Sequence, residues 1–196
     1  MSTWGRRVFV LALLAAAGLA GWFAAGGPPP LPLAGEDTGG GDVTLSVDQF
    51  YALSFADSDG NRQRLGQWRD KLLVVNFWAT WCPPCRKEIP DFVAVSREYA
   101  DRGVQFVGLG IDNAYNVSRF ADEQQVDYPL LVAGAGSLPI MSALGNPAMA
   151  LPYTLVVGAG GEIRYTRLGP MDRDALRNTL DRLLSRATGA SKPQPG

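Results

Sequence analysis

The sequence predicts an α/β fold with a parallel core sheet, and three consecutive stretches predict it. Residues 72–78, Leu-Leu-Val-Val-Asn-Phe-Trp, form an apolar run with the length of a buried strand. Residues 83–100 follow with apolar side chains at helical spacing, and Gly103 is expected to end this helix. A second apolar run over residues 104–111 completes a strand–helix–strand unit, which implies that the two strands lie parallel.

The composition places the chain among ordinary globular proteins. It has 196 residues, enough for one domain with extensions, of which 46% are hydrophobic and 19% charged. The formal net charge of −1 gives no indication of nucleic-acid binding. The sequence contains no histidine, which excludes Ser-His and Cys-His catalysis and copper sites of the Cys-plus-His type.

The N-terminal part is predicted to be an extension that precedes the domain. Residues 1–25 begin with a positive segment and continue with an uncharged apolar run over residues 8–25. A helix of that length is about 27 Å long, close to the hydrocarbon thickness of a bilayer, so we expect a membrane anchor or a cleaved signal segment. Residues 26–42, rich in Pro and Gly, are expected to form a linker. Either alternative places the rest of the chain outside the cytoplasm.

The folded domain is expected over residues 43–185, and residues 186–196 are expected to be a disordered tail. Residues 50–55 alternate like a strand, residues 57–61 have turn composition, and residues 62–65 are expected to return as a second strand. The other predicted elements are a short helix or turn over 66–70, a helix over 117–125, an extended segment over 127–132, a helix over 137–144, a hairpin of 151–157 and 162–166, and a closing helix over 172–184.

The only two cysteines, Cys82 and Cys85, stand between the first core strand and the helix. A thiol at a helix N-terminus faces free N–H groups and the positive end of the helix dipole, which lowers its pKa and makes it a nucleophile. Cys85 lies one turn later and could resolve a mixed disulfide on Cys82. A purely structural disulfide is the alternative, although so short a ring contributes only about 2 kcal/mol. A zinc site would lack two ligands, so we expect no metal.

Residues 77–90, Phe-Trp-Ala-Thr-Trp-Cys-Pro-Pro-Cys-Arg-Lys-Glu-Ile-Pro, resemble the active-site signature of thioredoxin-like proteins. More narrowly, they resemble the exported, often membrane-anchored thiol-disulfide oxidoreductases of the TlpA/ResA/CcmG group. The resemblance covers roughly residues 43–184. It implies a thioredoxin-like fold with an N-terminal β-hairpin, and a central insertion that corresponds to residues 117–132 of this chain.

The same resemblance implies a set of client-binding residues beside the cysteines. In thioredoxin-like proteins a cis-proline lies against the two cysteines, and Leu151-Pro152 matches that position. The backbone of Leu151 could then pair with a bound peptide as an added strand. An ordinary trans proline at a strand start is the alternative. Trp81 is expected to shield Cys82 and, with Pro83, to form part of the docking surface.

Two further residues are candidates for the control of proton transfer. Glu88 lies three residues after Cys85, and the matching glutamate of ResA-type proteins influences the cysteines' acid–base behaviour. If Glu88 is buried, its pKa rises and it can exchange protons with Cys85, whereas a solvated helix glutamate is the alternative. Asn76 departs from thioredoxin, which has a buried aspartate at the matching position. An amide cannot take up a proton, which increases the importance of Glu88.

These observations together predict an extracytoplasmic thiol-disulfide oxidoreductase that needs no cofactor. The resemblance favours reduction of disulfides in client proteins, for example apocytochrome c, with a membrane thiol reductase as electron donor. The expected location is the periplasmic or cell-surface side of the cytoplasmic membrane. A disulfide oxidase or isomerase, a non-catalytic binding module and a Cu(I) carrier are the alternatives, and the reduction potential decides the direction of electron flow.

Overall fold

The computed structural model describes residues 45–190, with side chains described to residue 186. These residues form a seven-stranded mixed sheet in the order β2-β1-β5-β4-β3-β6-β7. The strands are β1 (Ser54–Asp57), β2 (Arg62–Arg64), β3 (Leu72–Trp78), β4 (Val104–Gly110), β5 (Leu130–Val132), β6 (Tyr153–Val157) and β7 (Ile163–Leu168). The helices are α2 (Val47–Ala52), α3 (Pro83–Tyr99), α4 (Ala114–Gln124), α5 (Leu138–Ala143) and α6 (Arg173–Ala190), with single 3-10 turns η1 (Leu65–Trp68), η2 (Ala100–Arg102) and η3 (Ala135–Ser137).

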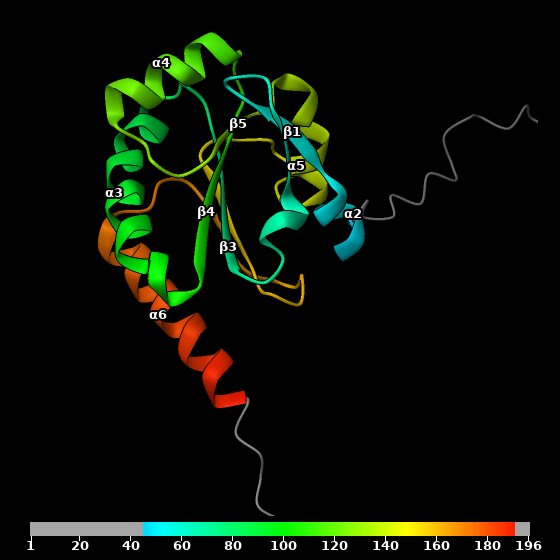
Figure 1. Cartoon of the computed structure of the whole chain (residues 1–196), viewed down its shortest axis with the longest axis vertical. Helices are drawn as coiled ribbons and strands as arrows, with labels where there is room; N and C mark the ends of the chain where they lie inside the picture. The colour runs from blue at the N-terminus through cyan, green and yellow to red at the C-terminus, as the bar shows by residue number, and fades with distance from the viewer. Residues whose placement is uncertain (1–44, 191–196) are drawn as a thin grey trace, which may run out of the picture. The chain divides into compact units, whose positions relative to one another are not determined.

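The two strands of the expected strand–helix–strand unit lie in the interior of the sheet. β3 and β4 pair in parallel from Leu72 opposite Val104 to Trp78 opposite Gly110, and all seven residues of β3 are buried. A strand that is covered on both faces needs apolar residues at every position, which explains its continuous apolar run. Figure 1 shows α3 and α6 together on one side of the sheet and α2 and α5 on the other. The α/β prediction is confirmed.

The expected insertion joins the N-terminal hairpin to the central strands. β1 and β2 pair in an antiparallel hairpin, as predicted. β5, which α4 precedes, pairs in parallel with β4 and antiparallel with β1. The inserted strand therefore lies between the hairpin and the core unit, which is why the sheet continues without a break from β2 to β7.

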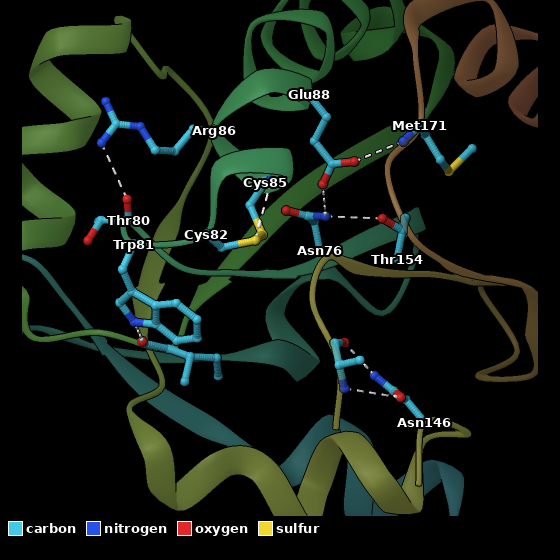
Figure 2. The surroundings of a disulfide bond; sticks show 12 residues. Asn76, Thr80, Trp81, Cys82, Cys85, Arg86, Glu88, Asn146, Thr154 and Met171 are labelled. Atoms are coloured by element: carbon cyan, nitrogen blue, oxygen red, sulfur yellow. Dashed lines mark hydrogen bonds between the residues drawn. A yellow bond between two sulfur atoms is a disulfide. The ribbon is translucent and has the colours of Figure 1, made fainter. Parts of the chain in front are cut away.

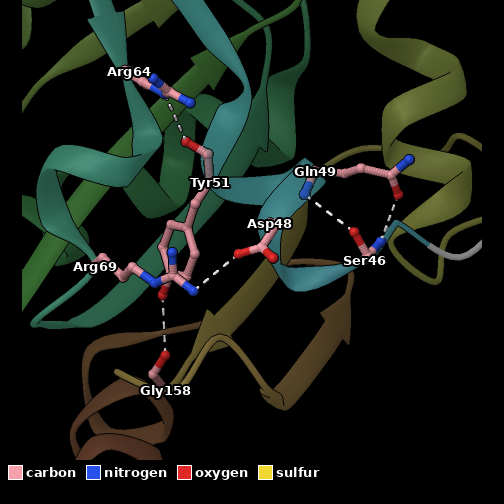
Figure 3. A network of polar contacts seen from close by, with 7 residues as sticks. All are labelled: Ser46, Asp48, Gln49, Tyr51, Arg64, Arg69 and Gly158. Carbon is pink, nitrogen blue, oxygen red and sulfur yellow. Dashed lines mark hydrogen bonds and ion pairs between the residues drawn. The ribbon is translucent and has the colours of Figure 1, made fainter.

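The strand expected over residues 50–55 is wrong in its first half, because residues 47–52 form helix α2. Ser46 is the N-cap, and its hydroxyl accepts a hydrogen bond from Gln49 N while the Gln49 side chain accepts one from Ser46 N, a complete capping box. Tyr51 packs inward and donates from its hydroxyl to the Gly158 carbonyl at 3.1 Å (Figure 3). The capping box is a local signal for a helix start, whereas the Tyr51 contact joins positions too far apart in sequence for an alternation pattern to contain it.

The closing helix α6 begins as predicted but ends later. Asp172 caps it, with its carboxylate accepting from Ala175 N at 2.8 Å. The helix continues to Ala190, so the first residues of the segment expected to be a disordered tail, 186–190, are helical. The expected anchor over residues 8–25 and linker over residues 26–42 lie outside the described residues. Within residues 45–190, no helix combines the length and the apolar character that crossing a membrane requires.

Candidate active site

The two cysteines lie where β3 gives way to α3. Cys82 is the N-cap of α3, and its sulfur accepts a hydrogen bond from the Cys85 N–H at 3.4 Å. The sulfurs are joined in a disulfide (Figure 2). Cys85 is completely buried, whereas Cys82 is 5% exposed, in the order expected for a resolving and an attacking thiol. Pro83 opens the helix and is exposed, since a proline ring is compatible with the first helical turn.

The loop before Cys82 presents Trp81 to solvent. Its side chain is 65% exposed, and its indole N–H donates to the Ile111 carbonyl at 3.3 Å. The preceding Thr80 donates from its hydroxyl to Asp112, directly after Ile111. Two hydrogen bonds therefore tie this loop to the end of β4, and they leave an indole face exposed beside the disulfide. Trp78, by contrast, is fully buried as part of the core.

The register of the sheet brings Pro152 to the same end of β3. β6 runs antiparallel to β3 with Tyr153 opposite Phe77, so Pro152 lies beside the C-terminal end of β3, from which the chain turns toward Cys82. The Leu151–Pro152 peptide bond is cis, as predicted. Leu151 is half-buried and Pro152 is buried.

Glu88 on α3 is buried and makes two hydrogen bonds. Its carboxylate accepts from Asn76 Nδ2 at 2.9 Å and from the Met171 backbone N–H at 2.9 Å (Figure 2). Burial without a cation raises the pKa of Glu88 to about 7, although the two hydrogen bonds to the carboxylate lower it in part. The solvated alternative is wrong, because only 2% of Glu88 is exposed.

Comparison with known protein families agrees with this geometry. The Redoxin family model matches residues 45–184. The chain belongs to the Redoxin family. Within that family it is an oxidoreductase of the thioredoxin-like TlpA/ResA/CcmG type, in agreement with the resemblance of its Trp-Cys-Pro-Pro-Cys motif.

The relatives of this Redoxin-family chain include redox proteins of several bacteria. The thioredoxin-like protein YneN of Bacillus subtilis is 31% identical over 133 residues, which cover 66% of this chain and 75% of the relative. The thiol-disulfide oxidoreductase ResA of Geobacillus thermodenitrificans is 26% identical over 127 residues, 64% of this chain and 71% of the relative.

Solved structures show the same fold. A thiol:disulfide interchange protein of the thioredoxin family from Chlorobium tepidum is 30% identical with a TM-score of 0.59, and the match covers 67% of this chain and 92% of the other. A thioredoxin-related protein from Neisseria meningitidis serogroup B is also 30% identical, with a TM-score of 0.60, and the match covers 67% and 98% of the two chains.

Three polar groups near the active site of this Redoxin-family chain were not predicted from the sequence. Thr154, fully buried on β6, accepts from Asn76 Nδ2 at 3.0 Å. Its signal was present, since it is the one polar side chain inside the apolar stretch Tyr-Thr-Leu-Val-Val. The Met171 N–H has no signal, because any residue has a backbone donor. Asp112 follows the second core strand, but nothing local indicates its bond to Thr80.

The described residues offer no metal site of the usual kind. Across 45–190, no group of three or more histidine, cysteine, aspartate or glutamate side chains is placed to hold a metal ion. The groups that the structure does bring together at the site are two sulfurs, one buried carboxyl group and the amide and hydroxyl groups of Asn76 and Thr154.

Proposed function

We propose that this protein reduces disulfides in client proteins through Cys82 and Cys85. The observation that carries the proposal is the position of Cys82 as the N-cap of α3, with its sulfur bonded to Cys85, in a chain of the Redoxin family. Backbone N–H groups and the helix dipole at that position favour a thiolate over a thiol. The CPPC pair is thereby suited to thiol–disulfide exchange.

The reaction takes place in two displacements. The Cys82 thiolate attacks one sulfur of the client disulfide, and the other client sulfur leaves as a thiolate that takes a proton from water. Cys85 then loses its proton and attacks Cys82, which releases the second client thiolate. The protein has then given two electrons to the client, and its own two thiols have become the disulfide. A dithiol of a membrane reductase restores the reduced pair by the reverse exchange.

Glu88 is proposed as the base that takes the proton from Cys85. Both residues belong to α3, three positions apart and both buried, so they share one face of the helix. A carboxyl group with a pKa of about 7 can accept and return a proton near neutral pH, which is what a general base of this kind must do.

The client is proposed to dock on the surface around Trp81, Pro83, Leu151 and Pro152. Trp81 offers an exposed aromatic face, and an extended client segment can pair with the Leu151 backbone as an added strand. The proposed location is the outer side of the cytoplasmic membrane, reached through residues 8–25. Apocytochrome c is a proposed client, by analogy with the ResA-type relatives.

Insulin reduction with the purified chain tests the reaction. We expect turnover with the wild type and none with Cys82→Ser. Cys85→Ser should instead accumulate a mixed disulfide with the client, since the second displacement is lost. Unchanged turnover of Cys82→Ser would contradict the mechanism. Glu88→Gln should slow reduction more at neutral than at alkaline pH, and Glu98→Gln is the matched control, because Glu98 lies on the outer face of α3 in an ion pair with Arg177.

The reduction potential tests the direction of electron flow. A value toward that of thioredoxin, about −270 mV, supports the reductase, whereas a value near about −120 mV, that of a strong oxidant such as DsbA, would make the chain an oxidase. In cells, loss of the protein should lower covalent haem in c-type cytochromes. External dithiothreitol and a wild-type copy should restore it, but a Cys82→Ser copy should not.

A further inference from the structure

Asn76 lies between the disulfide and Glu88 with one of its polar atoms unpaired. The side chain is 1% exposed. Its Nδ2 donates both to Glu88 Oε1 at 2.9 Å and to Thr154 Oγ1 at 3.0 Å. No donor in the described part of the chain reaches its Oδ1. Figure 2 shows this oxygen turned toward the disulfide, in which neither sulfur has a proton to donate. A buried acceptor without a partner is costly, so its position requires an explanation.

The hydrogen bonds of Glu88 determine where it can bind a proton. Its Oε2 accepts from the Met171 backbone N–H, and a backbone N–H can only donate. Since the carbonyl oxygen of a carboxylic acid is the stronger acceptor, this bond favours Oε1 as the oxygen that carries the proton. That oxygen faces Asn76 Nδ2, which is also a donor, so the arrangement in the structure fits the carboxylate and not the acid.

Asn76 can resolve this conflict by turning its carboxamide over. The turn would bring Oδ1 to the Glu88 proton and Nδ2 to the sulfurs. Thr154 tolerates both orientations, because a hydroxyl group accepts from Nδ2 in one and donates to Oδ1 in the other. Cys85, on the same face of α3 as Glu88, is the sulfur whose protonation the proposed mechanism changes.

We propose that Asn76 is a positioning residue that turns its carboxamide over when Glu88 and the Cys85 thiol exchange a proton. With Glu88 ionised, Oδ1 accepts from the Cys85 S–H. With Glu88 protonated, Nδ2 donates to the Cys85 thiolate. One proton leaves Cys85 Sγ and one is bound at Glu88 Oε1, so the total charge is unchanged, and the carboxamide itself transfers no proton. This inference rests on the proposed function, which supplies the reduced state.

Three other titratable groups near Glu88 do not compete with Cys85 for its proton. The Tyr128 phenol interacts with Glu88, but burial raises its pKa so far that it remains neutral. Asp91 on α3 and Arg173 on α6 are ion-paired with each other at 3.3 Å. Cys82 is the disulfide partner of Cys85 and becomes a second thiol on reduction, so its substitution by serine isolates Cys85.

A double-mutant cycle in the Cys82→Ser protein tests whether Asn76 transmits the effect of Glu88. The readout is the Cys85 thiol pKa, from thiolate absorbance against pH. Glu88→Gln should lower it by about half a unit to two units, because an amide facing Asn76 mimics the protonated acid and loss of the charge adds to the effect. In the Asn76→Leu background the shift should fall to less than half. An equal shift in both backgrounds would mean that the carboxylate acts directly, and would overturn the proposal.

A spectroscopic measurement keeps the test independent of whether Asn76→Leu folds. In the reduced wild type, the side-chain amide resonances of Asn76 should move with pH across the Glu88 titration, and in Glu88→Gln they should not. Asn146 is the internal control, a buried amide that bonds only the backbone of Ala150. Asn76 resonances as insensitive to pH as those of Asn146 would refute the inference. Insulin reduction by the same sample shows separately whether the proposed function stands.

Discussion

Glu88 is a buried carboxyl group whose hydrogen-bond donors, Asn76 and the Met171 N–H, carry no net positive charge. Its folded-state pKa of about 7 lies above the ordinary 4.5, so between these two values the folded state binds more protons than the unfolded state. The contribution of Glu88 to stability is therefore fully present below about pH 4.5 and is lost as the pH rises to about 7. Over that range the loss is about 3 kcal/mol.

Glu88→Gln removes this titration, so the variant should gain stability relative to wild type as the pH rises. We expect the difference in unfolding free energy between variant and wild type to increase by about 3 kcal/mol between pH 4.5 and 7 and to be constant on either side. Urea unfolding of the oxidised proteins measures it, because the disulfide removes the thiol titrations. A difference that stays flat across this range would show that Glu88 has an ordinary pKa.

Replacement of Trp81 is expected to weaken client binding without lowering the stability of the protein. Its indole is mostly exposed and held by a single hydrogen bond to Ile111, so little core packing is lost in Trp81→Ala. The variant should raise KM for a protein disulfide by about tenfold, the effect of losing one aromatic contact worth about 1.4 kcal/mol. Reduction of a small disulfide such as oxidised glutathione should change little. Tyr115→Ala, which removes the exposed aromatic side chain at the start of α4, is the matched control.

The sequence could predict the site residues whose chemistry is local. Cys82 and Cys85 are candidates because of their spacing before a helix, and Glu88 is one because of its resemblance to the glutamate of ResA-type proteins. Asn76 was singled out by comparison with thioredoxin, which has an aspartate at the matching position. The contact of Thr154 with Asn76 depends on the sheet register, and the contact of the Met171 N–H with Glu88 depends on the path of the chain into α6. The sequence alone could not predict either contact, because each joins residues about eighty positions apart.

At the scale of elements, the long strand and helix of the core were predicted correctly, and the prediction for the short helix α2 was wrong. β3 and α3 have enough residues for their apolar spacing to be distinctive, and α3 continues through Pro90 to Tyr99. Helix α2 has six residues, too few for the helical period to show, and its buried Phe50 and Tyr51 fit a strand as well as a helix. Its capping box, with Ser46 and Gln49 three residues apart, was the sequence signal for a helix start.

Loss of the capping box at the start of α2 is expected to lower the stability of the protein. Ser46→Ala removes the acceptor for the Gln49 N–H and should lower the unfolding free energy by about 1 kcal/mol. Ser46→Asn, which keeps a side-chain acceptor, should stay close to wild type. Urea unfolding measures both variants. Equal loss in the two variants would mean that the hydroxyl matters for a reason other than capping.

The whole molecule depends on pairings between segments far apart in the chain. The order β2-β1-β5-β4-β3-β6-β7 places the hairpin beside a strand formed more than seventy residues later, and Ala56 lies opposite Val132. β5 has three residues, so its local pattern predicts an extended segment but not its partners. The parallel unit was predictable because one helix joins two consecutive strands. The position of the inserted strand β5 could not be predicted, because the edges of β1 and β4 with which it pairs form only when the chain folds.

The position of β5 inside the sheet predicts a contrast between two leucines. Leu131 on β5 is 0% exposed, with β4 and β1 on either side, whereas Leu168 on the edge strand β7 is 52% exposed. Leu131→Ala should lower the unfolding free energy by about 2–5 kcal/mol, because it leaves a cavity where the hairpin joins the core. Leu168→Ala should change it by less than about 0.5 kcal/mol. Thermal or urea unfolding compares them directly, and similar losses would place β5 at the surface.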